Sequence, residues 1–175
     1  MKCLIINGSP RKGYTWKLVE NIKEKMQQEG NVEFEEIMLI EKNIPMCRGC
    51  FSCFTYGEDK CPHYEYINPI ATKITEADCL ILTSPVYALN ISGLLKNFID
   101  HTAYFYHRPR FFEKKALVVS STAGGFAKQN CKYMKDTLKH WGFNKVYLLS
   151  VIRKGEEELT EKVKAKCSAV AHEFT

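Results

Sequence analysis

Four cysteines form the most concentrated set of chemically active side chains in this sequence. Cys47, Cys50, Cys53 and Cys61 are spaced as Cys-x2-Cys-x2-Cys-x7-Cys. Thiolates at such short intervals can converge on one centre, and four of them complete the ligand set of a [4Fe–4S] cluster or of a tetrahedral zinc ion. The tight run of three favours the cluster, because zinc sites usually take their ligands as two separated pairs. Zinc, a disulfide pair and four reduced thiols on a surface loop remain the alternatives.

The length and charge of the chain limit the classes of protein to which it can belong. Its 175 residues are predicted to form one domain, residues 1–175, and the net charge of +5 comes from interspersed signs rather than from a basic block, so nucleic-acid binding is not expected. The first apolar run is too short for a signal peptide, and no later stretch could cross a bilayer. We therefore expect a cytoplasmic protein without membrane contact, in which cysteines stay reduced. The remaining cysteines are predicted to pack in the core: Cys3, Cys79, Cys131 and Cys167.

Five short apolar runs alternate with segments whose apolar residues recur at helical spacing. Four of the runs are continuous, as in strands buried on both faces of a parallel sheet, and the second alternates. Parallel strands need crossover connections, which the intervening helices supply. The pattern predicts a doubly wound α/β domain, with the cysteine-rich residues 47–61 inserted after the second strand. The predicted strands are residues 2–6, 32–37, 77–83, 116–120 and 146–151, and the predicted helices lie within 18–26, 66–75, 94–99, 133–141 and 159–170.

The loop after the first strand has the composition of a phosphate site. In an open α/β sheet the ligand lies beyond the carboxyl ends of the strands, and residues 8–15 lead there into a helix N-terminus, where an anion is stabilised. Tyr14 stands where a nucleotide-binding P-loop has its lysine, and the dinucleotide motif Gly-x-Gly-x-x-Gly is absent. The Ser9 and Thr15 hydroxyls and the amides from Arg11 to Thr15 suit a monophosphate. Ordinary turn and N-cap chemistry is the alternative.

Several segments together resemble one family, the flavodoxin-like NAD(P)H-dependent FMN reductases. They are residues 7–15, 83–87, 93–100 and 121–125, and the resemblance extends over most of the chain. Within that family the cysteine motif, which follows the second strand, is similar to that of the iron–sulfur flavoproteins. The resemblance implies a five-stranded parallel sheet in the flavodoxin order 2-1-3-4-5. It also implies that Cys47, Cys50, Cys53 and Cys61 hold a [4Fe–4S] cluster.

The resemblance further assigns residues to FMN. The phosphate would lie against the first loop, the ribityl chain and ring along the third strand's loop, and the polar edge of the ring against the fourth strand's loop, where glycines let backbone amides approach. The implied cofactor-binding residues are Ser9, Arg11, Gly13, Tyr14, Thr15 and Trp16 in the first loop, Pro85, Val86, Tyr87 and Asn90 in the second, and Thr122, Ala123, Gly124 and Gly125 in the third.

The resulting functional hypothesis is an FMN-dependent oxidoreductase that couples flavin to a [4Fe–4S] cluster. NAD(P)H or a redox protein would donate electrons, a small molecule or a protein would accept them, and no side chain is predicted as a catalytic acid or base. The alternatives are a cluster-free NAD(P)H-dependent FMN or quinone reductase, a flavin-binding electron carrier without turnover, and a zinc-stabilised loop. The resemblance also implies a homodimer or homotetramer. The aromatic segment 104–112 would then lie near a neighbouring subunit's flavin, or pack against its own domain.

Overall fold

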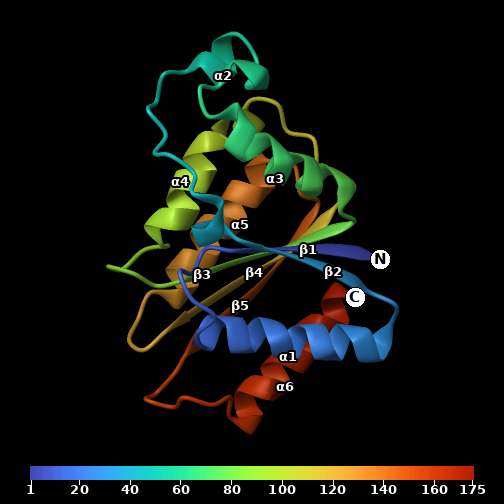
Figure 1. The fold of residues 1–175 in the computed structure, drawn as a ribbon. Helices are drawn as coiled ribbons and strands as arrows, with labels where there is room; N and C mark the ends of the chain where they lie inside the picture. The colour runs from blue at the N-terminus through green and yellow to red at the C-terminus, as the bar shows by residue number, and fades with distance from the viewer.

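The computed structural model, which describes residues 1–175, is built on one five-stranded parallel sheet (Figure 1). The strand order is β2-β1-β3-β4-β5, so the predicted doubly wound, flavodoxin-like fold is confirmed. β1 lies between β2 and β3, with Ile6 opposite both Ile37 and Leu82. The strands are β1 (Lys2–Asn7), β2 (Glu33–Met38), β3 (Cys79–Pro85), β4 (Lys115–Thr122) and β5 (Lys145–Ile152).

Helices cover both faces of the sheet. Figure 1 shows α1 and α6 together on one face and α3, α4 and α5 on the other. Each layer has its own buried hydrophobic cluster, and β1, β3 and β4 contribute alternate residues to both, which explains their continuous apolar sequences. The main helices are α1 (Tyr14–Glu29), α3 (Tyr64–Glu76), α4 (Gly93–His101), α5 (Ala127–His140) and α6 (Glu161–Phe174).

Element boundaries depart from the sequence pattern mainly at helix ends. α1 begins at Tyr14, four residues before Leu18, and Trp16 in its first turn belongs to the buried core cluster of this face. Trp141 follows the end of α5 and is fully buried. Leu159 precedes α6. Hydrophobic spacing reports which residues face the core, and such residues continue past the last helical hydrogen bond.

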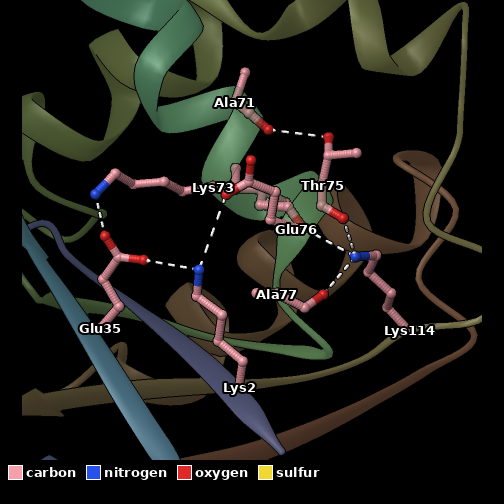
Figure 2. A network of polar contacts seen from close by, with 9 residues as sticks. Lys2, Glu35, Ala71, Lys73, Thr75, Glu76, Ala77 and Lys114 are labelled. Carbon is pink, nitrogen blue, oxygen red and sulfur yellow. Dashed lines mark hydrogen bonds and ion pairs between the residues drawn. The ribbon is translucent and has the colours of Figure 1, made fainter.

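At the amino-terminal end of the sheet, lysine side chains form ion pairs and hydrogen bonds that connect the strands to α3 (Figure 2). The Glu35 carboxylate on β2 pairs with Lys73 of α3 and with Lys2 of β1, the latter at 3.5 Å. Lys114, just before β4, donates to carbonyl groups at the end of α3, including that of Thr75 at 2.5 Å. Burial lowers the pKa of Lys114. A cation there stabilises the negative end of the helix, so this end of the sheet is fixed while the opposite end remains open.

The cysteine segment lies between β2 and α3. After η1 (Leu39–Lys42) it contains the short helix α2 (Ser52–Thr55) and η2 (Glu58–Lys60). Figure 1 shows α2 beyond α3 and α4, at the outer side of their layer. None of the helices combines the length and hydropathy that a membrane crossing requires.

Candidate functional site

A cleft of about 390 Å³ opens at the carboxyl ends of β1, β3 and β4. This volume lies within the usual range of small-molecule sites, about 300–1,000 Å³. The cleft brings together ten of the predicted cofactor residues: Ser9, Arg11, Gly13, Tyr14, Thr15, Pro85, Val86, Tyr87, Thr122 and Ala123. Sequence reasoning did not find four other lining residues: Lys17, Ser121, Arg153 and Glu157.

The loop after β1 is held close to α4 and β3. Asn7 is buried, and its Oδ1 accepts hydrogen bonds from the Ser9 amide at 2.8 Å and from the Thr83 hydroxyl at 3.0 Å. The Gly8 amide donates to the Thr83 carbonyl at 2.9 Å. A Cβ on Gly8 would lie 2.7 Å from Leu95 Cβ and 2.9 Å from the Thr83 oxygen. Glycine at this position therefore lets the loop lie against the neighbouring strand and helix.

The N-terminus of α1 faces the cleft without a capping side chain. Its N-cap residue is Gly13, which offers no acceptor. The backbone N–H groups of Lys12, Tyr14 and Thr15 have no acceptor in the chain. The first N–H groups of a helix carry the positive end of its dipole and bind anions such as phosphate. This terminus is therefore suited to an anionic group in the cleft.

Side chains around the same terminus add to its suitability. Arg11 and Arg153 line the cleft, and neither forms an ion pair with a carboxylate. The Tyr14 hydroxyl is buried and has no hydrogen-bond partner. Burial, followed by the charge of Glu156, raises the pKa of Tyr14, so this hydroxyl stays protonated. A buried hydroxyl without a partner costs about 1–3 kcal/mol.

Hydrogen bonds join the three loops that form the walls. The hydroxyl oxygens of Thr15 and Ser121 lie 2.6 Å apart. The Val86 amide donates to the Ser121 carbonyl at 3.0 Å, and the Asn130 side chain donates to the Pro85 carbonyl at 3.3 Å. The loops after β1, β3 and β4 therefore hold a fixed relative position before any ligand enters.

Four predicted cofactor residues do not line the cleft. Trp16 is buried on the inner face of α1, with Lys12 Nζ 4.3 Å from its ring centre. Asn90 closes a tight turn with Tyr87, and its Oδ1 accepts from the next amide at 2.8 Å. The central residues of this turn, Ala88 and Leu89, have φ values of 46° and 68°, which is uncommon for residues other than glycine. The other two, Gly124 and Gly125, are exposed at the tip of the loop after β4.

The four cysteines lie around a second, small hollow. Cys47, Cys50, Cys53 and Cys61 all line it, and all are free thiols. No group of three or more histidine, cysteine, aspartate or glutamate side chains is arranged to hold a metal ion. Burial, and then the nearby Cys61, raises the pKa of Cys53. The thiols therefore share one site, but their sulfur atoms do not converge on a common centre.

Residues far along the chain anchor this segment. On α4, Asn97 accepts from the Cys47 amide at 2.9 Å and donates to the Pro45 carbonyl at 3.1 Å. His101 Nε2 donates to the same carbonyl at 2.8 Å, which leaves Nδ1 facing Cys61 Sγ at 3.9 Å. Sequence reasoning missed Asn97 and gave His101 no role, because neither position has a local motif linking it to the cysteines.

The aromatic segment 104–112 packs mainly against its own domain. Tyr104, Phe105 and Phe111 are buried. Two arginines of the same segment reach back to the cysteines: Arg108 donates to the Cys53 carbonyl, and Arg110 pairs with Glu58. Tyr106 and Phe112 of the same segment are exposed, so packing within the domain covers only part of its aromatic surface.

Comparison with known proteins identifies the family. The sequence profile of the NADPH-dependent FMN reductases matches residues 1–151. The chain belongs to the NADPH-dependent FMN reductase family. It is 34% identical to an iron-sulfur flavoprotein of Archaeoglobus fulgidus over 144 residues, which is 81% of this chain and 64% of that protein. An iron-sulfur flavoprotein of Clostridioides difficile is 29% identical over 97% of this chain and 76% of its own length.

A solved structure agrees on the fold. The NAD(P)H:quinone oxidoreductase from Methanothermobacter marburgensis superimposes with a TM-score of 0.80 at 19% identity, covering 100% of this chain and 99% of that one. The chain spans 64% of the length of the first curated relative and about half the length of two further iron-sulfur flavoproteins. Membership of the family therefore rests on the sequence of this chain, and the arrangement of its strands and helices rests on both sequence and structure.

Proposed function

We propose that the chain binds FMN in the cleft and acts as an oxidoreductase that takes electrons from NAD(P)H or from a redox protein. The observation that supports this most strongly is the uncapped N-terminus of α1, with its three unpaired amides. A terminal phosphate would satisfy them. Arg11 would add a charge-assisted hydrogen bond. The description of the matching family, which names FMN, points to the same cofactor.

The remaining cleft residues would hold the rest of the cofactor. The loop at Pro85, Val86 and Tyr87 would lie along the ribityl chain and ring, with Thr122 and Ala123 at the polar edge of the ring. The hydrogen bond from the Val86 amide to the Ser121 carbonyl, which joins these two loops, would help to keep the ring in one orientation. Bound FMN accepts electrons in pairs and can release them singly, and this is the chemistry that the cofactor supplies.

We further propose that Cys47, Cys50, Cys53 and Cys61 hold a [4Fe–4S] cluster. The four thiols form no disulfide bonds and surround one hollow, and thiolate sulfur is the ligand that holds such clusters. The names of two relatives, both iron-sulfur flavoproteins, agree with it. Binding would require the sulfur atoms to draw together. Asn97 and Arg108 would keep the backbone at Cys47 and at Cys53 in place during that movement.

A cluster-free FMN or quinone reductase is the second candidate. It is favoured by the absence of a metal-binding group among the cysteines. The two candidates differ in metal content. The first should contain about four iron and four acid-labile sulfide ions per FMN when purified without oxygen. Flavin without iron would select the second, and zinc without sulfide would select a structural knuckle.

Two substitutions test the cofactor sites separately. Arg11→Ala should weaken FMN binding about tenfold or more, since a hydrogen bond to a charged group contributes about 1.5–3 kcal/mol. Lys12→Ala is the matched control, because Lys12 points to Glu36 and Trp16 instead of into the cleft. Cys50→Ser should abolish iron binding, whereas the core variant Cys167→Ala should retain it. Equal FMN affinities in both loop variants would place the phosphate elsewhere, and steady NAD(P)H oxidation with a quinone would separate an enzyme from a passive carrier.

A further inference from the structure

A long hollow follows the outer edge of β5. It consists of two adjoining cavities of about 550 and 520 Å³, which share Lys128 and Ser150. We call the two together the β5 groove. The groove lies between α5 and the start of α6, and it contains none of the predicted cofactor residues and none of the four clustered cysteines Cys47, Cys50, Cys53 and Cys61. Its combined volume exceeds that of the cleft, so it requires a separate account.

Unpaired lysines line both sides of the groove. Three come from α5 at helical spacing, which places them on one face. None of the six lysines in the groove forms an ion pair, although Lys164 on the adjacent turn pairs with Glu161 at 2.8 Å. The only acidic residues in the groove are Asp136 and Glu156. The lysines are Lys128, Lys132 and Lys135 of α5, Lys154 of the loop after β5, and Lys162 and Lys166 of α6.

The floor of the groove is apolar and open to pairing. β5 is an edge strand, so one row of its backbone donors and acceptors has no partner in the sheet. Leu148 and Ile152 on this strand are 44% and 54% exposed, and Phe126 is 42% exposed. Exposed apolar side chains framed by charge are typical of a protein interface. A nucleic-acid backbone would use the lysines but not these side chains.

The charge of the groove selects the kind of partner. A second copy of this chain placed symmetrically on the groove would bring the two sets of lysines together, and like charges in an interface cost several kcal/mol. An acidic protein would instead neutralise them. The positive charge of the groove therefore favours binding of an acidic partner over self-association.

The groove and the cleft share a wall. In the loop after β4, Ala123 lines the cleft and Phe126 lines the groove. In the loop after β5, Arg153 and Glu157 face the cleft, whereas Lys154 and Glu156 face the groove. A protein seated in the groove would thus be separated from a ligand in the cleft only by these two loops.

We propose that the β5 groove is the docking surface for an acidic electron-carrier protein that exchanges electrons with flavin bound in the cleft. This inference rests on the proposed function. In each encounter the reduced metal centre of the carrier is oxidised and gives one electron to the flavin. Two encounters deliver the electron pair that fully reduces it, and solvent supplies the protons. NAD(P)H would approach through the cleft and would not need the groove.

The test compares two reductants on the FMN-loaded full chain. Flavin absorbance is followed in stopped flow with a two-cluster [4Fe–4S] ferredoxin of net negative charge, reduced beforehand, and separately with NAD(P)H. The groove variant carries Lys128→Glu and Lys132→Glu. The control variant carries Lys25→Glu and Lys42→Glu, which change the net charge equally on another part of the surface. Binding of the ferredoxin to the FMN-free chain is measured by calorimetry, so that docking is observed even where flavin chemistry fails.

The groove variant should be reduced by ferredoxin at least about tenfold more slowly at low salt, because electrostatic steering changes association rates by about 10–1,000-fold. The difference should shrink as the Debye length falls from about 30 Å at 0.01 M to about 3 Å at 1 M salt. The rate of reduction by NAD(P)H should stay within about twofold.

The proposal is overturned if the control substitutions slow reduction by ferredoxin equally, if ferredoxin neither binds nor reduces the wild type, or if duplex DNA binds the groove more tightly than ferredoxin. Loss of flavin binding in every protein would instead refute the proposed function.

Discussion

Substituting Gly8 with alanine tests the packing that places the phosphate loop. The added Cβ would lie 2.7 Å from Leu95 Cβ and 2.9 Å from the Thr83 oxygen. Carbon atoms prefer separations of about 3.5–4.0 Å, so the loop must move by about 1 Å. The Thr83 oxygen belongs to the sheet and cannot yield as a flexible side chain would. Overpacking of this kind typically costs about 1–3 kcal/mol.

The same movement should weaken FMN binding. The Gly8 amide bond to Thr83 would lengthen, and the unpaired amides that follow in the loop would shift from their present positions. Loss of one hydrogen bond to the phosphate corresponds to about tenfold in affinity, since 1.4 kcal/mol is a factor of ten. Stability is measured by urea unfolding of the cofactor-free chain, and affinity by quenching of flavin fluorescence.

Gly93→Ala is the matched control for this experiment. A Cβ at Gly93 would meet nothing within 4 Å, and the residue lies at the start of α4 with an ordinary φ value. Alanine there should be neutral or should stabilise the protein by up to about 1 kcal/mol. If Gly8→Ala leaves both the urea midpoint and the FMN affinity within error of wild type, the close approach of the loop to β3 and α4 is wrong.

Two further predictions concern the opposite end of the sheet and the cysteine segment. The hydrogen bond from Lys73 lowers the pKa of Glu35. The stabilisation that this carboxylate gives the fold is therefore complete above the unfolded pKa near 4.5, and it is lost as the pH falls through the folded pKa. Urea titrations should show that acid lowers the free energy of unfolding less in Glu35→Gln than in wild type, and equal decreases in both proteins would contradict this. Asn97→Ala removes the anchor of the Cys47 amide, so alkylation of the cysteine thiols should accelerate several-fold while FMN affinity stays within about twofold; unchanged alkylation kinetics would show that Asn97 does not hold the segment.

The strands and the first loop were predictable because their signals are local. A run such as Cys3–Ile6 is buried on both faces, so its composition alone identifies a central strand. The helix that follows leaves its first amides unpaired wherever no cap residue is present, and Gly13 supplies none. Residues that line the cleft through such local geometry were therefore found. The same helical spacing also carried a signal that was overlooked, since Trp16 lies three residues before Val19 on the buried face.

The residues that were missed belong to contacts between distant segments. Ser121 meets Thr15 only because β4 lies two strands from β1 in the sheet order. Arg153 enters the cleft because its amide donates to the Thr122 carbonyl at 2.8 Å and continues the pairing of β5 with β4. The polar side chain of Asn90 is of a type that binds ligands, but its Oδ1 accepts a hydrogen bond within its own turn. Such positions have no motif, and only the assembled sheet defines them.

One helix connects the two proposed redox sites. At the N-terminus of α4 the Ser92 hydroxyl donates to the Gly8 carbonyl and accepts from the Leu95 amide at 3.1 Å, which joins the helix to the phosphate loop. Near its C-terminus, Asn97 and His101 hold the segment that bears the cysteines. At 1.5 Å per residue, Ser92 is separated along this rigid element by about 7.5 Å from Asn97 and by about 13.5 Å from His101. Two cofactors mounted on loops alone would vary in separation as the loops moved. Because both loops are fixed to the same short helix, a flavin in the cleft and a cluster in the cysteine hollow would keep a constant relative position, which repeated electron exchange between them requires.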